Sequence, residues 1–79
     1  MYNVERGFKM EFEKVSPEQA QQWDDDETLD KVNEWKGFKE GETMGGGLIT
    51  RIYVHHESEA VWLVFNVEGN LFERGIPYN

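Results

Sequence analysis

The residues of this chain that could do chemistry are mainly carboxylates. Sixteen acidic residues against eight basic ones give a net charge of −8, and Asp26, Asp30 and Glu34 recur at every fourth position. On a helix these three would form one row, with about 6 Å between neighbours. A fixed row of negative charge can take the place of phosphates on a basic protein surface. The sequence therefore predicts that the acids of this region bind a basic surface of a target, most simply a nucleic-acid-binding protein. The predicted contact residues are Asp24, Asp25, Asp26, Glu27, Asp30 and Glu34.

The same acidic residues also have a structural interpretation. Asp24 to Glu27 would be stabilised at the start of a helix by its unpaired N–H groups and its dipole. The other acids would then be solvated charge that keeps the chain soluble. The row itself does not help the fold, because each like-charge pair four residues apart costs a helix about 0.2–0.5 kcal/mol. Both interpretations, a binding surface and a merely solvated one, are open at this point.

Metal-binding and catalytic patterns are weak. His55 and His56 are adjacent within or just after a predicted strand, where successive side chains point to opposite faces and do not easily share a metal ion. The glycines 45–47 lack the lysine, the hydroxyl and the following helix of a phosphate-binding loop. Carboxylates on an exposed helix seldom have the shifted pKa values that acid–base catalysis needs. We therefore expect no enzyme, no cofactor and no metal site, and we interpret His56 to Glu59 as a polar hairpin tip.

The composition fits a single domain of residues 1–79. A chain of this length has room for one core, and 38% hydrophobic and 14% aromatic residues are enough to order it. The lack of cysteine excludes disulfides and thiolate–metal sites. The negative charge repels phosphates and anionic lipid, so we expect no direct nucleic-acid or membrane binding. Because no apolar run resembles a signal sequence or a membrane span, we expect a cytoplasmic protein.

The N-terminal half predicts a strand followed by helix. Residues 7–15 alternate between apolar and charged side chains, as a strand with one wet face does, after a flexible tail at residues 1–6. Ser16, Pro17 and Gln19 then supply an N-cap hydroxyl, a proline at the first helical position and the amide of a capping box. The acids 24–26 interrupt the apolar pattern, and either Asp25 or Asp26 could cap a second helix. Residues 16–36 are thus predicted to form one helix or two.

The C-terminal half predicts a meander of strands. Five glycines make residues 37–47 a mobile loop. Strand-rich runs follow at residues 48–55, 60–67 and 71–74, separated by turn residues. The predicted fold is therefore α+β: a four-stranded, mainly antiparallel sheet, in the order strand, helix or helix pair, then three strands, with helix packed on one face.

One predicted strand is apolar on both sides. Val61, Leu63 and Phe65 point one way, whereas Trp62 and Val64 point the other. A single helical layer covers only one of these faces, so Trp62 and Val64 must meet the glycine loop, the N-terminal tail or another chain. If another chain covers them, the protein forms a homodimer through a surface that comprises Tyr53, Trp62 and Val64.

Three functions are therefore open. The first is a non-catalytic inhibitor or adaptor that occupies a basic surface of its target. It would act as a nucleic-acid mimic, and viral anti-defence proteins are an example that only the composition suggests. The second is a structural or assembly module that self-associates through the apolar sheet face. The third is a small ligand-binding or enzymatic domain in which the glycine loop closes over a pocket.

Overall fold

The computed structural model describes residues 13–79. The predicted tail at residues 1–6 and the part of the predicted first strand at residues 7–12 lie outside this range. In chain order the elements are β1 (Glu13–Val15), α2 (Pro17–Asp25), β2 (Asp30–Lys31), β3 (Glu34–Trp35), β4 (Phe38–Lys39), β5 (Thr43–Met44), β6 (Gly47–His55), β7 (Ala60–Val67) and β8 (Asn70–Ile76).

The strands form a small antiparallel sheet with one helix, as the predicted fold class requires in outline. The sheet has six strands rather than the predicted four. Its order is β1-β8-β7-β6-β2, with β5 also paired to β6, and β3 and β4 form a separate two-stranded sheet. The additional strands are two-residue pieces in the segments predicted to be second helix and loop. The strands β6, β7 and β8 are the predicted meander.

Helix α2 begins where the sequence predicts. The Ser16 side chain accepts a hydrogen bond from the backbone N–H of Gln19 (3.0 Å), and proline follows the cap. The Gln19 side chain does not complete the capping box, since it donates to Gln22 instead (3.4 Å). Nine residues are too few for a helix to be stable in isolation, so α2 depends on its packing against the sheet.

The helix ends at Asp25 and no second helix follows it, which corrects the prediction that residues 16–36 form one helix or two. The chain turns at Asp26 and continues as β2 and β3. Val32 and Trp35 both pack against the core from this extended segment. A spacing of three residues also places side chains on one face of a helix, but here the chain bends between two short strands.

The glycine-rich segment supplies tight hairpin turns. Gly45 and Gly46 join β5 to β6 in a two-residue turn with φ of 59° and 87°. Positive φ at both central positions matches the right-handed twist of a hairpin and favours glycine. The segment is also bonded to β6, since the N–H of Gly41 donates to the Ile49 carbonyl (2.9 Å). Its mobility stays a prediction.

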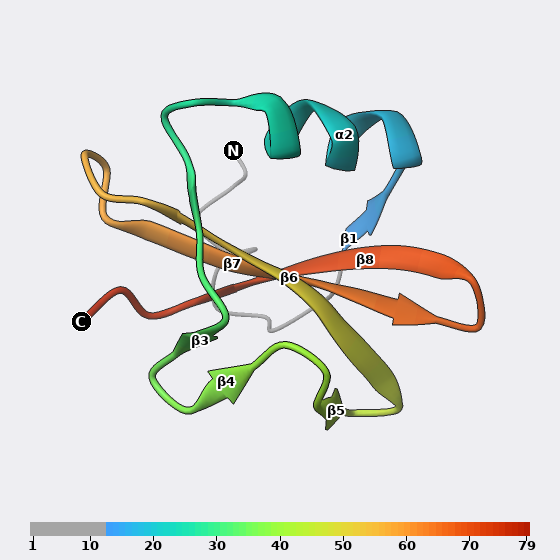
Figure 1. Cartoon of the computed structure of the whole chain (residues 1–79). Coiled ribbons are helices and arrows are strands. Elements are labelled where there is room, and N and C mark those ends of the chain that lie inside the picture. The colour runs from blue at the N-terminus through green and yellow to red at the C-terminus, as the bar shows by residue number, and fades with distance from the viewer. Residues whose placement is uncertain (1–12) are drawn as a thin grey trace, which may run out of the picture.

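The sheet lies between two layers. Helix α2 lies over one face, and the segment that carries β3, β4 and β5 lies under the other (Figure 1). The second face holds the main hydrophobic core, whose buried members are Ile49, Ile52, Val54, Val61, Leu63 and Phe65. The arrangement is the reverse of the expected one, because the helix covers the face of Trp62 and Val64, whereas residues 32–44 cover the face of Leu63.

Among residues 13–79, no helix has the length and apolar character needed to cross a membrane.

Candidate protein-interaction surface

The densest run of acids, Asp24 to Glu27, spans the C-terminal end of helix α2. Asp25 is its last residue, Asp26 is the C-cap and Glu27 lies in the following turn, and no basic residue occupies the last turn. The C-terminal end of a helix carries the negative pole of its dipole. The predicted structural account, in which these acids stabilise a helix start, is therefore wrong. Their charge opposes the dipole instead.

Asp26 shapes the turn after the helix. Its carboxylate accepts hydrogen bonds from the Thr28 hydroxyl (2.7 Å) and the Thr28 backbone N–H (2.9 Å). Both bonds lower the pKa of Asp26 below its usual value of 3.8, and the bond from the Thr28 hydroxyl has the larger effect. Asp26 thus stays ionised under all but strongly acidic conditions.

Asp24 makes several contacts within the chain. Its Oδ1 accepts a hydrogen bond from the Tyr53 hydroxyl (2.8 Å), and it lies 3.4 Å from the Arg51 Nε and 3.6 Å from the Lys31 Nζ. Burial raises the pKa of Asp24, but the Tyr53 bond and the two cations together bring it below 3.8. Burial and the same bond raise the pKa of Tyr53, so its hydroxyl remains a donor.

The predicted row of Asp26, Asp30 and Glu34 on one helix does not exist. Asp30 lies in β2, where its Oδ2 is 2.8 Å from His56 Nε2. Glu34 lies in β3, where its carboxylate accepts a hydrogen bond from the N–H of Gly37 (2.9 Å). The prediction failed because it required one continuous helix.

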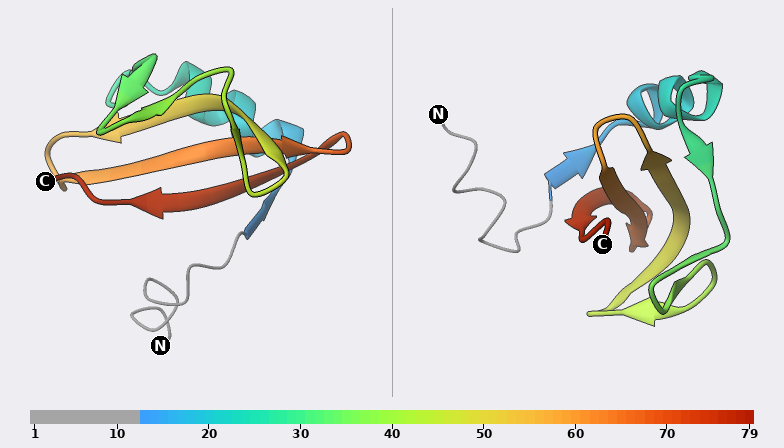
Figure 2. Two further views of the ribbon diagram at one scale, coloured as in Figure 1. Left: turned by 90° about the horizontal axis from the view of Figure 1, so that it is seen from below. Right: turned by 90° about the vertical axis from the view of Figure 1, so that its left-hand side faces the viewer.

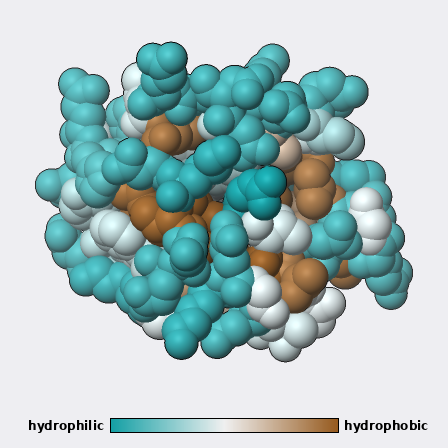
Figure 3. Space-filling view, viewed as in Figure 1, coloured by the Kyte–Doolittle hydropathy of each residue, from teal (hydrophilic) through white to brown (hydrophobic). Residues whose placement is uncertain are grey.

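Of the six acids predicted to bind a partner, all except Asp24 are exposed, and four of them lie close together in the chain. We call Asp25, Asp26, Glu27 and Asp30, all exposed, the acidic segment. It runs from the helix end down the side of the sheet, past the β6–β7 hairpin (Figure 2, right). Glu57 and Glu59 lie in that hairpin, which the contact between Asp30 and His56 ties to β2. Seen as in Figure 1, the surface is mostly hydrophilic, with hydrophobic side chains visible only in patches (Figure 3).

The residues predicted for self-association are covered within the chain. Tyr53 is 0% exposed and Val64 is 1% exposed. The Trp62 ring packs against Trp23 of α2, with centroids 5.5 Å apart, and Trp23 also contacts Tyr53 at 5.6 Å. Since α2 occupies this face, Tyr53, Trp62 and Val64 do not form the exposed apolar patch that the prediction required.

The two histidines make different contacts. His55 Nδ1 lies 2.6 Å from the Ser58 hydroxyl within the hairpin. His56 joins distant parts of the chain, because its second ring nitrogen, Nδ1, lies 2.9 Å from the Tyr78 hydroxyl. Within residues 13–79, no group of three or more histidine, aspartate or glutamate residues is placed to hold a metal ion. No sequence pattern indicated the contact of Tyr78, which lies 22 residues from its partner His56.

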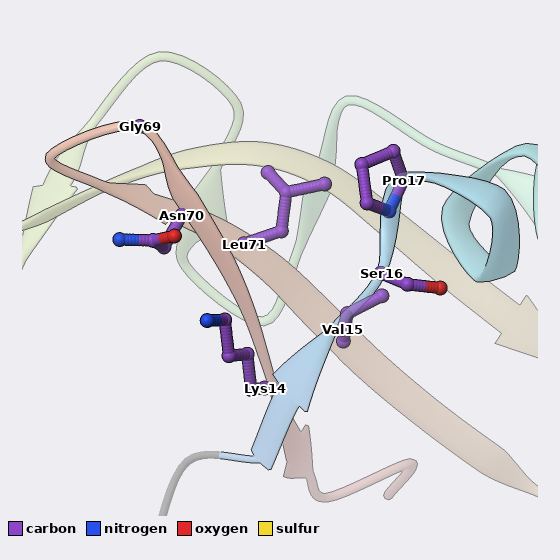
Figure 4. Close-up of a pocket in the computed structure, with 7 residues that line it drawn as sticks. All are labelled: Lys14, Val15, Ser16, Pro17, Gly69, Asn70 and Leu71. Carbon is purple, nitrogen blue, oxygen red and sulfur yellow. The ribbon is translucent and has the colours of Figure 1, made fainter.

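One pocket bears on the ligand-binding alternative. It has a volume of about 490 Å³ and lies between the start of α2 and the β7–β8 turn (Figure 4), and none of its described lining residues comes from the glycine-rich segment 37–47. Val15, Pro17 and Leu71 give it apolar walls, and among the described residues that line it only Lys14 is titratable. The predicted closure of the glycine-rich segment over a pocket therefore does not describe this cavity.

The sequence matches no protein-family model, and no curated protein and no solved structure matches it significantly.

The position of the acids at the helix end has a measurable consequence. We expect Asp25→Asn to raise the free energy of unfolding by about 0.3–1 kcal/mol at low salt, because it removes a negative charge from the negative pole of α2. The amide oxygen can still accept the bond from Gln21. Chemical denaturation at low and high salt measures the change, which high salt should diminish.

Glu18→Gln is the matched control for this prediction. Glu18 lies in the first turn of α2, where the dipole favours negative charge, so the same neutralisation should lower stability by a similar amount. If both substitutions change stability in the same direction, the dipole does not govern the energetics of these carboxylates.

Proposed function

We propose that this chain is a non-catalytic, acidic protein-binding module, an inhibitor or adaptor that occupies a basic surface of its target. The observation that supports the proposal most is the placement of Asp25, Asp26 and Glu27 at the end of α2, without a basic residue in the last turn. Charges in this position weaken the helix. A sequence under selection for stability alone would favour lysine or arginine there.

The contact residues are a subset of those that the sequence predicts. Asp24 is omitted, since one of its oxygens meets a hydroxyl and two cations of the chain itself. Glu34 is omitted as well, because it lies in β3, beyond the run from Asp25 to Asp30. The acidic segment remains, together with the neighbouring Glu57 and Glu59. These carboxylates would attract a cationic target over a Debye length of about 10 Å at 0.1 M salt.

A target that binds nucleic acid is the finer form of the proposal. A net charge of −8 on 79 residues gives long-range attraction to the cationic surfaces that otherwise contact phosphates. Binding of this kind would be competitive with nucleic acid and would weaken as salt rises. Nothing in this role requires a cofactor or a reaction step.

Charge reversal in the acidic segment tests this proposal. We expect Asp25→Lys/Glu27→Lys to lose the target that the unchanged protein captures from lysate of its natural host. The matched control, Glu40→Lys/Glu42→Lys, makes the same change in net charge at two exposed residues of the segment between β4 and β5, and it should retain the target. Quantitative proteomics of the bound fraction, eluted with rising salt and separately with duplex DNA, is the measurement.

The possible outcomes test the contact surface and the nature of the target separately. A protein that binds the unchanged chain and the control, but not Asp25→Lys/Glu27→Lys, and that DNA releases, supports both the surface and the nature of the target. Release by salt but not by DNA would retain the basic target and reject the nucleic-acid mimic. Equal capture by all three proteins, with equal salt dependence, would reject the acidic segment as the contact surface.

A further inference from the structure

Three aromatic rings meet beside the acidic segment. Trp35 of β3, His56 after β6 and Tyr78 of the C-terminal tail lie with ring centroids 5.4–6.4 Å apart. We call these three residues the aromatic corner. None of them is fully buried, and the His56 side chain is 53% exposed. The corner therefore presents aromatic surface to solvent at the junction of three segments that are far apart in the sequence.

Hydrogen bonds hold the corner in place. The Trp35 indole N–H donates to the Pro77 carbonyl (3.1 Å), and His56 Nδ1 lies 2.9 Å from the Tyr78 hydroxyl. Trp35 and Tyr78 also pack against the main hydrophobic core. Rings fixed in this way lose little conformational entropy when a partner binds, which is a property of the anchors in protein interfaces.

Negative charge adjoins these rings. The Asp30 carboxylate, whose side chain is 60% exposed, reaches His56 through one of its oxygens, and Glu57 is the next residue in the chain. Lys31, the base that follows Asp30, is directed to Asp24, with 3.6 Å between Nζ and Oδ1. An aromatic surface beside a carboxylate is complementary to a planar cation.

We propose that the aromatic corner receives an arginine side chain of the target, an inference that rests on the proposed function and deepens it. A guanidinium group can stack on an aromatic ring and donate in its own plane to a carboxylate at the same time. A lysine ammonium is a compact, strongly hydrated charge and does not combine these contacts. Exposed ion pairs by themselves contribute little to binding, so the corner supplies the directional part of recognition and the acidic segment supplies the attraction.

Two peptides of equal charge test this inference. Nona-arginine and nona-lysine are titrated into the full chain labelled with ¹⁵N, at the same salt concentration. We expect nona-arginine to bind about tenfold more tightly, with chemical-shift changes at the Trp35 indole N–H as well as in the acidic segment. Tyr78→Leu, which keeps an apolar side chain against the core, should reduce the preference to about twofold or less.

Two further variants make the test specific. His56→Gln alters the corner without removing core packing, and it gives a second measurement if Tyr78→Leu does not fold. Asp25→Asn/Glu27→Gln should weaken the binding of both peptides to the same extent and preserve the preference for arginine. Equal affinity for the two peptides, with shift changes only in the acidic segment, overturns the arginine inference but leaves the proposed function standing. Failure of both peptides to bind at low salt overturns the inference together with the acidic segment.

Discussion

Trp23→Ala is expected to lower the free energy of unfolding by about 2–3 kcal/mol. Tryptophan-to-alanine changes in cores cost roughly 3–5 kcal/mol, and Trp23 is half-buried, so a smaller loss applies. The change removes the edge contacts with Tyr53 and Trp62 and opens to water a tyrosine that is 0% exposed. Because α2 has no fully buried residue of its own, it depends on this indole more than a longer helix would.

Thermal and chemical denaturation followed by circular dichroism measure this effect. For a domain of this size, 1 kcal/mol corresponds to about 4–8 °C in Tm, so a fall of about 10–20 °C is expected. Gln22→Ala is the control, since Gln22 is the preceding helical residue and is exposed; it should leave Tm nearly unchanged. If Trp23→Ala melts within about 2 °C of the unchanged protein, α2 is not held on the sheet by the indole.

Asp24→Asn has the second-largest expected effect, a loss of about 1–2 kcal/mol at pH 7. The amide oxygen can still accept a hydrogen bond from the Tyr53 hydroxyl, but a neutral acceptor forms a weaker bond than a carboxylate. The attraction to Arg51 and Lys31 also disappears. It contributes modestly, because these two side chains are 46% and 45% exposed and solvent screens them.

The pH dependence of this effect follows from the lowered pKa of Asp24. A carboxyl whose pKa is lower in the folded state stabilises the fold above its unfolded pKa, and that contribution is lost as pH falls through the folded pKa. The difference between the unchanged protein and Asp24→Asn should thus be full above about pH 5 and diminish below about pH 4. Urea denaturation from pH 7 to pH 2.5 measures it. A difference that stays constant over this range would show that Asp24 acts through its shape and not its charge.

The sequence predicted the elements that local chemistry determines. Ser16 and Pro17 marked the start of α2, because capping and the fixed φ of proline act within one turn. The three long strands were found because alternation and turn residues mark them together. Residues 37–47 were predicted only as a loop, and the short strands β4 and β5 and the hairpin turn at Gly45 and Gly46 were not predicted.

The sequence did not predict what long-range packing determines. The residues 29–36 have helical spacing of apolar side chains, but Val32 and Trp35 reach the core from an extended chain. The alternation of side chains along a strand also does not show which layer covers which face of the sheet. The helix was therefore expected over the face of Leu63, whereas it covers the face of Trp62. The bond between Tyr53 and Asp24 spans 29 residues, and no local pattern indicates it. The predicted row of acids was therefore wrong in its geometry, because Asp30 and Glu34 lie in short strands.

The short strands around β6 also limit how any partner can bind. Thr43 and Met44 pair with its beginning, Val32 donates to the Ile52 carbonyl, and β2 pairs with its end. The backbone groups on this side of β6 are thereby occupied along most of the strand. A foreign strand cannot extend the meander there, which guards against fibril-like stacking of copies. Recognition on this flank must be made by side chains.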